Sequence, residues 1–173
     1  MITMTNPERI HPSTTAGERE MLDSWLDFHR ETLALKCAGL SEEQLRETAV
    51  EPSDMSLLGL VRHLTEVEQG WFHRVLADED VPRPYTSDEN PDGDFHFTGR
   101  DTWEQAHTAW REAIGRSREL AATRSLDDLM EGRHRSGRTY NLRWIYVHMI
   151  EEYARHNGHA DLLRQRIDGA TGE

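Results

Sequence analysis

Four long segments of the chain carry apolar residues three, four and seven positions apart, so that these residues share one face of a helix. The segments cover about residues 17–38, 52–77, 101–123 and 141–167. The sequence has no run in which apolar and polar residues alternate, which is the pattern of a half-buried β-strand. The pattern therefore predicts an all-α protein built from four long amphipathic helices.

Residue types at the ends of these segments indicate where the helices begin and end. Residues 41–44 resemble a capping box, so we expect a short helical turn there. Pro52 is expected to open the second long helix, and Asp101 with Glu104 is expected to cap the third. Gly169 is expected to end the fourth helix.

Residues 78–100 separate the second and third helices and break the helical pattern. They contain three prolines and two glycines, and they are long for a loop in a compact domain. We interpret them as a crossover that joins two parallel helices, with Phe95 and Phe97 packed back onto the helices. The predicted fold is therefore a four-helix bundle with a long crossover between helices two and three.

Length and composition limit the domain organisation and the location of the protein. The 173 residues suit a loose leader at 1–15 followed by one domain at 16–169. The leader lacks the apolar run of a signal peptide, and no stretch approaches the ~20 apolar residues of a membrane span. The one cysteine, Cys37, lies among leucines and is expected to be a buried, inert thiol. These features predict a cytoplasmic protein without a membrane partner.

The charge of the chain restricts its partners. The formal net charge is -12 at pH 7, which opposes binding to nucleic acid or to an anionic membrane. We therefore expect small molecules as partners. A homodimer is a separate expectation that the charge does not address.

The fourth helix carries candidate ligands on the face that its apolar residues define. Those apolar residues are Ile145, Met149, Leu163 and Ile167. The same face carries His148, Glu152, His156 and His159. Burying an unpaired carboxylate costs several kcal/mol, and a metal ion would compensate for that cost. The pattern therefore favours a metal site at the centre of this face.

A third ligand from another helix would complete such a site. Glu152 and His156 are four positions apart, which brings both side chains to one ion. The best candidate for the third ligand is His63, at the border of the apolar stripe of the second helix. Two histidines and one glutamate, with a fourth position open to water or substrate, form the ligand set of a catalytic zinc site.

Each of these signals also has an ordinary structural explanation. A single histidine such as His63 is most often a hydrogen-bonded core or boundary residue, and a Glu–His pair at this spacing is frequent by chance. We expect all five tryptophans in the core, namely Trp25, Trp71, Trp103, Trp110 and Trp144. Spacing alone leaves both interpretations of the ligand set open.

Two segments resemble a known superfamily. Residues 57–68, followed by Trp71, resemble the second helix of DinB-like proteins, and residues 150–164 resemble the fourth. The whole chain is similar to the actinobacterial branch that includes the mini-circle protein family. It resembles mycothiol-dependent maleylpyruvate isomerase more distantly.

The resemblance implies a ligand set. Many DinB-like proteins use three histidines, whereas the isomerase has a glutamate at the first position on the last helix. The implied metal ligands are therefore His63, Glu152 and His156. The residues expected in the second shell or the cleft are His148, His159 and Arg155.

The resemblance also implies a function. It indicates a zinc-dependent S-transferase that uses mycothiol, or another low-molecular-weight thiol, to modify small electrophiles. The metal would lower the pKa of the thiol, and nickel is an alternative to zinc. Two other interpretations stay open, a metal-dependent hydrolase and a non-enzymatic, metal-stabilised binding protein linked to stress. Whether the protein is an enzyme is therefore left open by the sequence.

Overall fold

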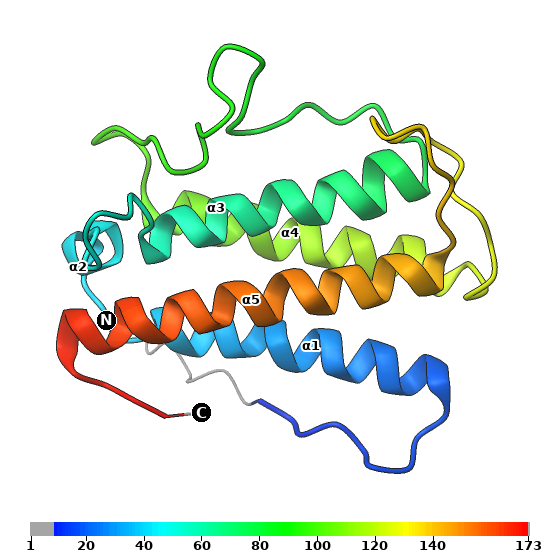
Figure 1. Ribbon diagram of the computed structural model, residues 1–173, viewed down its shortest axis with the longest axis horizontal. Helices are drawn as coiled ribbons and strands as arrows, with labels where there is room; N and C mark the ends of the chain where they lie inside the picture. Colours follow the sequence, from blue (N-terminus) through cyan, green and yellow to red (C-terminus); the bar gives the residue numbers. More distant parts are fainter. Residues whose placement is uncertain (1–8, 173) are drawn as a thin grey trace. The chain divides into compact units, whose positions relative to one another are not determined.

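The structure is a computed structural model that describes residues 9–172. The first eight residues of the predicted leader lie outside this range. The helices are α1 (Glu18–Cys37), α2 (Glu42–Arg46), α3 (Leu57–Glu68), the π-helix η1 (Gln69–Leu76), α4 (Trp103–Ala122) and α5 (Leu142–Asp168) (Figure 1). Within residues 9–172 the only β-type pairing is an isolated bridge between Leu129 and Asn141. The all-α prediction is confirmed.

The chain divides into two compact units. Unit 1 holds the described residues up to Leu57 and those from Ile150 onward, and unit 2 is Leu58–Met149. Helix α5 therefore contributes its first turns to unit 2 and the rest to unit 1. The assembly of all four long helices into one bundle, within one domain, stays a prediction. No helix among the described residues has the length and hydrophobicity that crossing a membrane requires.

Unit 1 places α1 alongside the C-terminal part of α5. The Asn157 side chain donates a hydrogen bond to the backbone oxygen of His29 at 3.0 Å. Further along both helices, Lys36 Nζ lies 2.6 Å from a carboxylate oxygen of Asp161, and Arg164 donates to two carbonyls at the end of α1. Because residue numbers rise together along both helices, α1 and this part of α5 run parallel.

The short helix α2 follows the predicted capping box. The Ser41 hydroxyl accepts a hydrogen bond from the backbone N–H of Gln44 at 3.2 Å, and the Gln44 side chain accepts one from the Ser41 N–H at 2.9 Å. These two bonds satisfy N–H groups that have no partner within the helix. Leu45, which follows directly, is buried.

Two predicted helix starts were displaced. Helix α3 begins at Leu57 instead of near Pro52, because residues 50–53 form a turn in which the Ser53 N–H donates to the Val50 carbonyl. Helix α4 is capped by Thr102 with Gln105, not by Asp101 with Glu104. Both pairs have the spacing of a capping box, but the Asp101 carboxylate is already engaged by Thr98 and Arg62.

Unit 2 places α3 and η1 parallel to α4. Arg62 pairs with Asp101 at 3.0 Å, just before α4 begins. The next contact along the two helices is between His73 Nε2 and the Ala113 carbonyl, at 3.1 Å, and Arg116 pairs with Glu79 beyond it. The predicted long connection between parallel helices is therefore confirmed (Figure 1).

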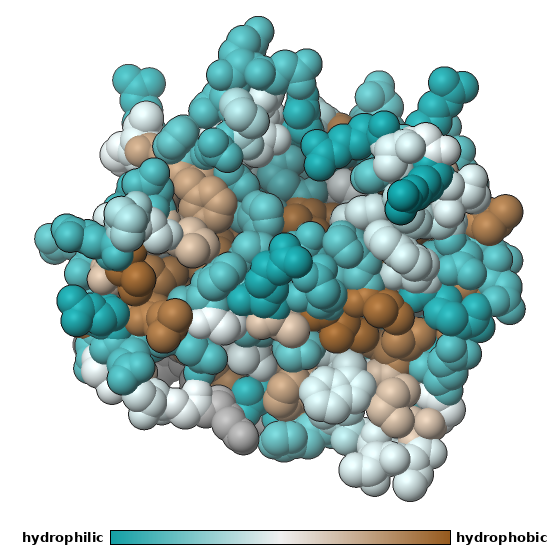
Figure 2. Space-filling view, viewed as in Figure 1, coloured by the Kyte–Doolittle hydropathy of each residue, from teal (hydrophilic) through white to brown (hydrophobic). Residues whose placement is uncertain are grey.

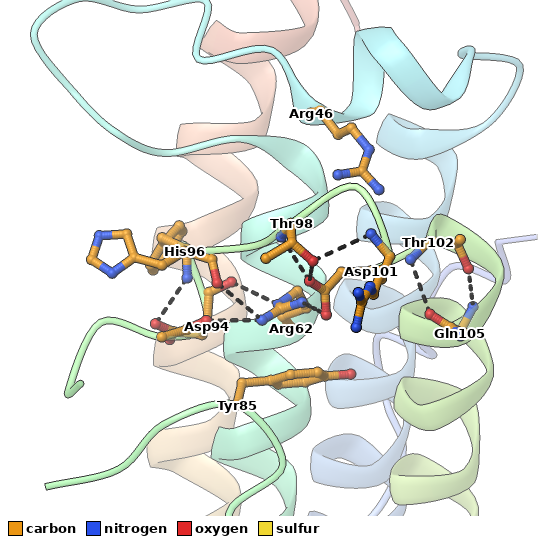
Figure 3. Close-up of polar contacts among 12 residues, drawn as sticks. Arg46, Arg62, Tyr85, Asp94, His96, Thr98, Asp101, Thr102 and Gln105 are labelled. Carbon is orange, nitrogen blue, oxygen red and sulfur yellow. Dashed lines mark hydrogen bonds and ion pairs between the residues drawn. The ribbon is translucent and has the colours of Figure 1, made fainter. Parts of the chain in front are cut away.

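Two buried charged residues of α3 fix this connection. Arg62 donates to the carbonyl oxygens of Asp94, at 2.9 Å, and Gly93, at 2.8 Å, and its guanidinium lies 4.2 Å from the ring centre of Tyr85 (Figure 3). One oxygen of Glu66 accepts from the backbone N–H groups of Tyr85 and Thr86, each at 2.8 Å. The connection is thus held by charge-assisted hydrogen bonds, which are stronger than neutral ones.

The expected packing of Phe95 and Phe97 against the helices is confirmed within unit 2. The ring of Phe95 stacks on His63 with centroids 5.8 Å apart, and the Phe97 ring lies 5.6 Å from the Arg62 guanidinium carbon.

The placement of the tryptophans in the core was wrong in part. Trp110 is fully buried, whereas Trp25 and Trp144 are 40% and 42% exposed. Hydrophobic residues also gather in patches on the otherwise hydrophilic face of Figure 2.

Candidate metal centre

His63 lies on α3 and is held by a carboxylate from the crossover. Its Nδ1 is 2.7 Å from Asp94 Oδ2, and the Asp94 side chain is almost fully buried. The other oxygen of Asp94 accepts the Phe95 backbone N–H at 3.1 Å. A carboxylate in this position favours the tautomer with hydrogen on Nδ1, so that Nε2 carries the lone pair that a metal ion would use.

Sequence reasoning missed Asp94. The residue is 31 positions from His63, and its only signal is an acid placed directly before the aromatic pair of the crossover. The contact depends on the hydrogen bonds by which Arg62 holds the backbone of residues 93 and 94 next to α3. The sequence alone does not give the conformation of this loop, so the contact could not be predicted from it.

Glu152 and His156 share one face of α5. Glu152 Oε2 lies 3.5 Å from His156 Nε2, and both side chains are largely shielded from solvent. The i, i+4 spacing places them one turn apart on the same side. Their ligand atoms therefore face each other at a separation that allows both to contact one cation.

His159 supports the opposite side of the His156 ring. The Nδ1 atoms of the two rings are 3.3 Å apart. The pKa of His159 is lowered, first by burial and then by electrostatic interaction with His156 and Arg155. A neutral His159 can accept the Nδ1–H of His156, which leaves His156 Nε2 as the ligand atom.

The two remaining residues of the expected set lie elsewhere. His148 stacks on Trp144, with ring centroids 4.9 Å apart, and meets the edge of Trp71 at 4.7 Å. Arg155 is exposed and pairs with Glu151 one turn earlier on α5. His148 thus belongs to an aromatic cluster, and Arg155 to an exposed ion pair.

The aromatic cluster was another feature that sequence reasoning missed. It consists of Trp71, His134, Tyr140, Trp144 and His148. Its rings come from η1, from the loop before α5 and from the first turns of α5. The two tryptophans had been expected in the core, but half-exposed rings from three segments form a surface layer instead.

The expected metal ligands belong to different units, His63 to unit 2 and both Glu152 and His156 to unit 1. Together these side chains would offer two nitrogen donors and one oxygen donor, a set that suits zinc. Their binding of one shared ion stays a prediction.

The helices, the long crossover, the histidine on α3 and the Glu–His pair on α5 fit the DinB-like class of proteins. The family model of the mycothiol S-transferases matches residues 21–169, and the chain belongs to this family. No curated relative matches the sequence.

Proposed function

We propose that the protein is a mycothiol S-transferase that uses one zinc ion, held by His63, Glu152 and His156, to modify small electrophiles. Family membership supports the thiol, and the Glu152–His156 pair on α5 supports the metal. The observation that carries the proposal is the pairing of each histidine: Asp94 holds His63 at Nδ1, and His159 holds His156 at Nδ1. Metal-binding histidines almost always have such a partner on the other ring nitrogen.

The charges of the ligands fit a thiol reaction. Two neutral histidines and one carboxylate leave a divalent ion with a net charge of +1, which favours an anionic fourth ligand. When bound, zinc lowers the pKa of a thiol so that the thiolate forms at neutral pH. In the overall reaction the thiol loses its proton, sulfur forms a bond to the electrophilic carbon, and the leaving group departs with its electron pair.

The protein's own thiol does not serve this reaction. Cys37 is buried at the end of α1, and burial raises the pKa of its thiol to about 12. A thiol with that pKa is almost entirely protonated at neutral pH, and the thiolate is the reactive form. The nucleophile is therefore an external thiol.

The test combines metal analysis with a thiol-dependent assay. Untagged protein should carry about one zinc ion per chain, with nickel as the measured alternative. Conjugation of 1-chloro-2,4-dinitrobenzene should require zinc and mycothiol, with bacillithiol and glutathione as comparison thiols. His63→Ala, Glu152→Ala and His156→Ala should each abolish turnover, whereas His96→Ala, which changes an exposed crossover histidine, should not.

Three other outcomes would reject parts of the proposal. Zinc-dependent hydrolysis of an activated ester that needs no thiol would favour a hydrolase. Bound metal without turnover, combined with unfolding on chelation, would favour a binding protein in which the metal stabilises the fold. Retention of metal at unchanged affinity by Glu152→Gln would exclude Glu152 as a ligand. Sedimentation of the same protein would test the expected homodimer.

A further inference from the structure

Unit 1 contains a pocket that the proposed metal ligands do not line. The pocket has a volume of about 720 Å³ and lies along α1 and the C-terminal part of α5. The residues that matter for its chemistry are Arg9, Trp25, Phe28, Lys36, Asn157 and Asp161. Pockets of about 300–1,000 Å³ hold small organic molecules. The pocket is thus large enough for a ligand of its own.

A buried acceptor in this pocket has no hydrogen-bond partner among residues 9–172. Asn157 is 5% exposed, and its Nδ2 donates to the His29 carbonyl at 3.0 Å, which fixes the orientation of the amide. The Oδ1 of Asn157 receives no hydrogen bond from the described residues. A buried polar atom in this state is unfavourable, and native proteins satisfy nearly all such atoms. Because Asn157 lines the pocket, a ligand with an O–H or N–H group would supply the missing bond.

The pocket also offers a positive charge that no carboxylate of the described residues neutralises. The Arg9 guanidinium lies 4.5 Å from the ring centre of Phe28 and donates to the Thr32 hydroxyl at 3.1 Å. Within residues 9–172 no carboxylate pairs with Arg9, whereas Lys36 is neutralised by Asp161. The pKa of His29 is lowered, mainly by burial and also by the charge of Arg9. Arg9 is therefore the group in this pocket that would bind an anion.

Aromatic rings form the apolar part of the pocket. The Trp25 and Phe28 rings meet edge to face at 5.5 Å, and Trp25 lies 5.9 Å from the His29 ring. The ring centres of His11 and Phe28 are 5.2 Å apart. Trp25 is nevertheless 40% exposed, which is high for a tryptophan whose role is to fill a core. A planar apolar group would cover this surface.

From these three features we propose that the pocket binds a small aromatic carboxylate that also carries a hydroxyl or amide N–H. The carboxylate pairs with Arg9, the ring packs on Trp25 and Phe28, and the donor bonds to Asn157 Oδ1. The site is separate from the proposed metal centre and does not require transferase activity. It gives the protein a second small-molecule site, formed by α1, α5 and the segments at either end of the described chain.

The proposal is tested by calorimetric titration with three related probes. We expect 4-hydroxyphenylacetate to bind best because it has the carboxylate, the ring and the donor. Phenylacetate lacks the donor, and 2-(4-hydroxyphenyl)ethanol lacks the charge, so each should bind about tenfold more weakly. Failure of all three to bind at millimolar concentration, or equal affinities for the three, would overturn the proposal.

Variants identify the contacts and separate this site from the metal centre. Arg9→Gln should weaken 4-hydroxyphenylacetate about tenfold and leave the affinity for 2-(4-hydroxyphenyl)ethanol unchanged. Asn157→Leu should remove the preference for the hydroxylated probe, with circular dichroism as the check on folding. Arg133→Gln, which changes an exposed arginine of unit 2, is the matched control. His63→Ala should bind the probe as the parent does, and loss of binding there would show that the probe occupies the metal centre.

Discussion

Asp94→Asn tests whether the carboxylate next to His63 prepares a metal ligand. The two Asp94 oxygens accept from different groups, Oδ2 from His63 Nδ1 at 2.7 Å and Oδ1 from the Phe95 N–H at 3.1 Å. An asparagine has one oxygen and one NH₂ group, so it cannot accept from both. If the oxygen stays with Phe95, the NH₂ group faces Nδ1 and moves the ring hydrogen to Nε2, the expected ligand atom.

The other orientation of the asparagine is also unfavourable, because the NH₂ group would then face the Phe95 N–H. A charge-assisted hydrogen bond contributes about 1.5–3 kcal/mol, and loss of such a partner weakens metal binding about 10–100-fold. We therefore expect the zinc dissociation constant of Asp94→Asn to rise about 10–100-fold.

The assay is competition for zinc with a chromophoric chelator, at a pH near 7. Circular dichroism and urea unfolding should show that the variant keeps its helices. Asp92→Asn, which changes an exposed acid two residues earlier on the same loop, is the matched control and should leave zinc affinity unchanged. Equal affinities of Asp94→Asn and the parent would refute a role for Asp94 in zinc binding.

Three further predictions concern stability and reactivity. Arg62→Met should lower the free energy of unfolding by about 3–5 kcal/mol in urea, because it leaves buried carbonyls of the crossover without their donor; Arg100→Met is the exposed control, and a loss below about 1 kcal/mol would contradict the prediction. Cys37 should react with iodoacetamide only after unfolding, because burial raises the pKa of its thiol to about 12; rapid alkylation of the folded protein would contradict this. Burial lowers the pKa of His73 below its ordinary value of 6.5, while Glu79 and Glu68 oppose this shift and Arg116 adds to it. Below about pH 6.5, His73 therefore binds a proton more readily in the unfolded chain than in the folded protein. The free energy of unfolding consequently falls as the pH is lowered. In His73→Gln the loss of stability between about pH 7.5 and 5.5 should be smaller, and an equal loss would exclude His73 as its cause.

The helices could be predicted from the sequence because their signals are local. The apolar period predicted α1 to within one residue at each end and α4 to within two, and the capping box before α2 was confirmed. The α4 cap was predicted at the wrong residue because that residue makes a different interaction. Asp101 had the spacing of a cap but is engaged by Arg62, a residue 39 positions earlier, so the cap moved to Thr102.

The tryptophans show why burial was harder to predict than helix position. An amphipathic pattern identifies the inward face but not how far a neighbouring segment covers its edge. Trp110 lies in the middle of the α4 stripe and is fully buried, whereas Trp144 lies in the first turn of α5 and joins a half-exposed layer with His134 and Tyr140. Exposure at helix ends depends on the adjacent loop, whose course has no periodic signal.

The contacts of the candidate site also differ in whether they depend on one helix or on a distant loop. Glu152 and His156 lie one turn apart on one helix, so their proximity follows from helix geometry alone. The pairing of His63 with Asp94 instead requires the crossover to return to α3, which depends on Arg62 and Glu66 binding its backbone. Asp94, the partner of His63, is therefore positioned by buried charges on the helix that carries His63. A charged side chain inside an apolar stripe, such as Arg62 beside His63, is consequently a sign that a distant loop is anchored there. That loop is then the place to seek the partner of the neighbouring histidine.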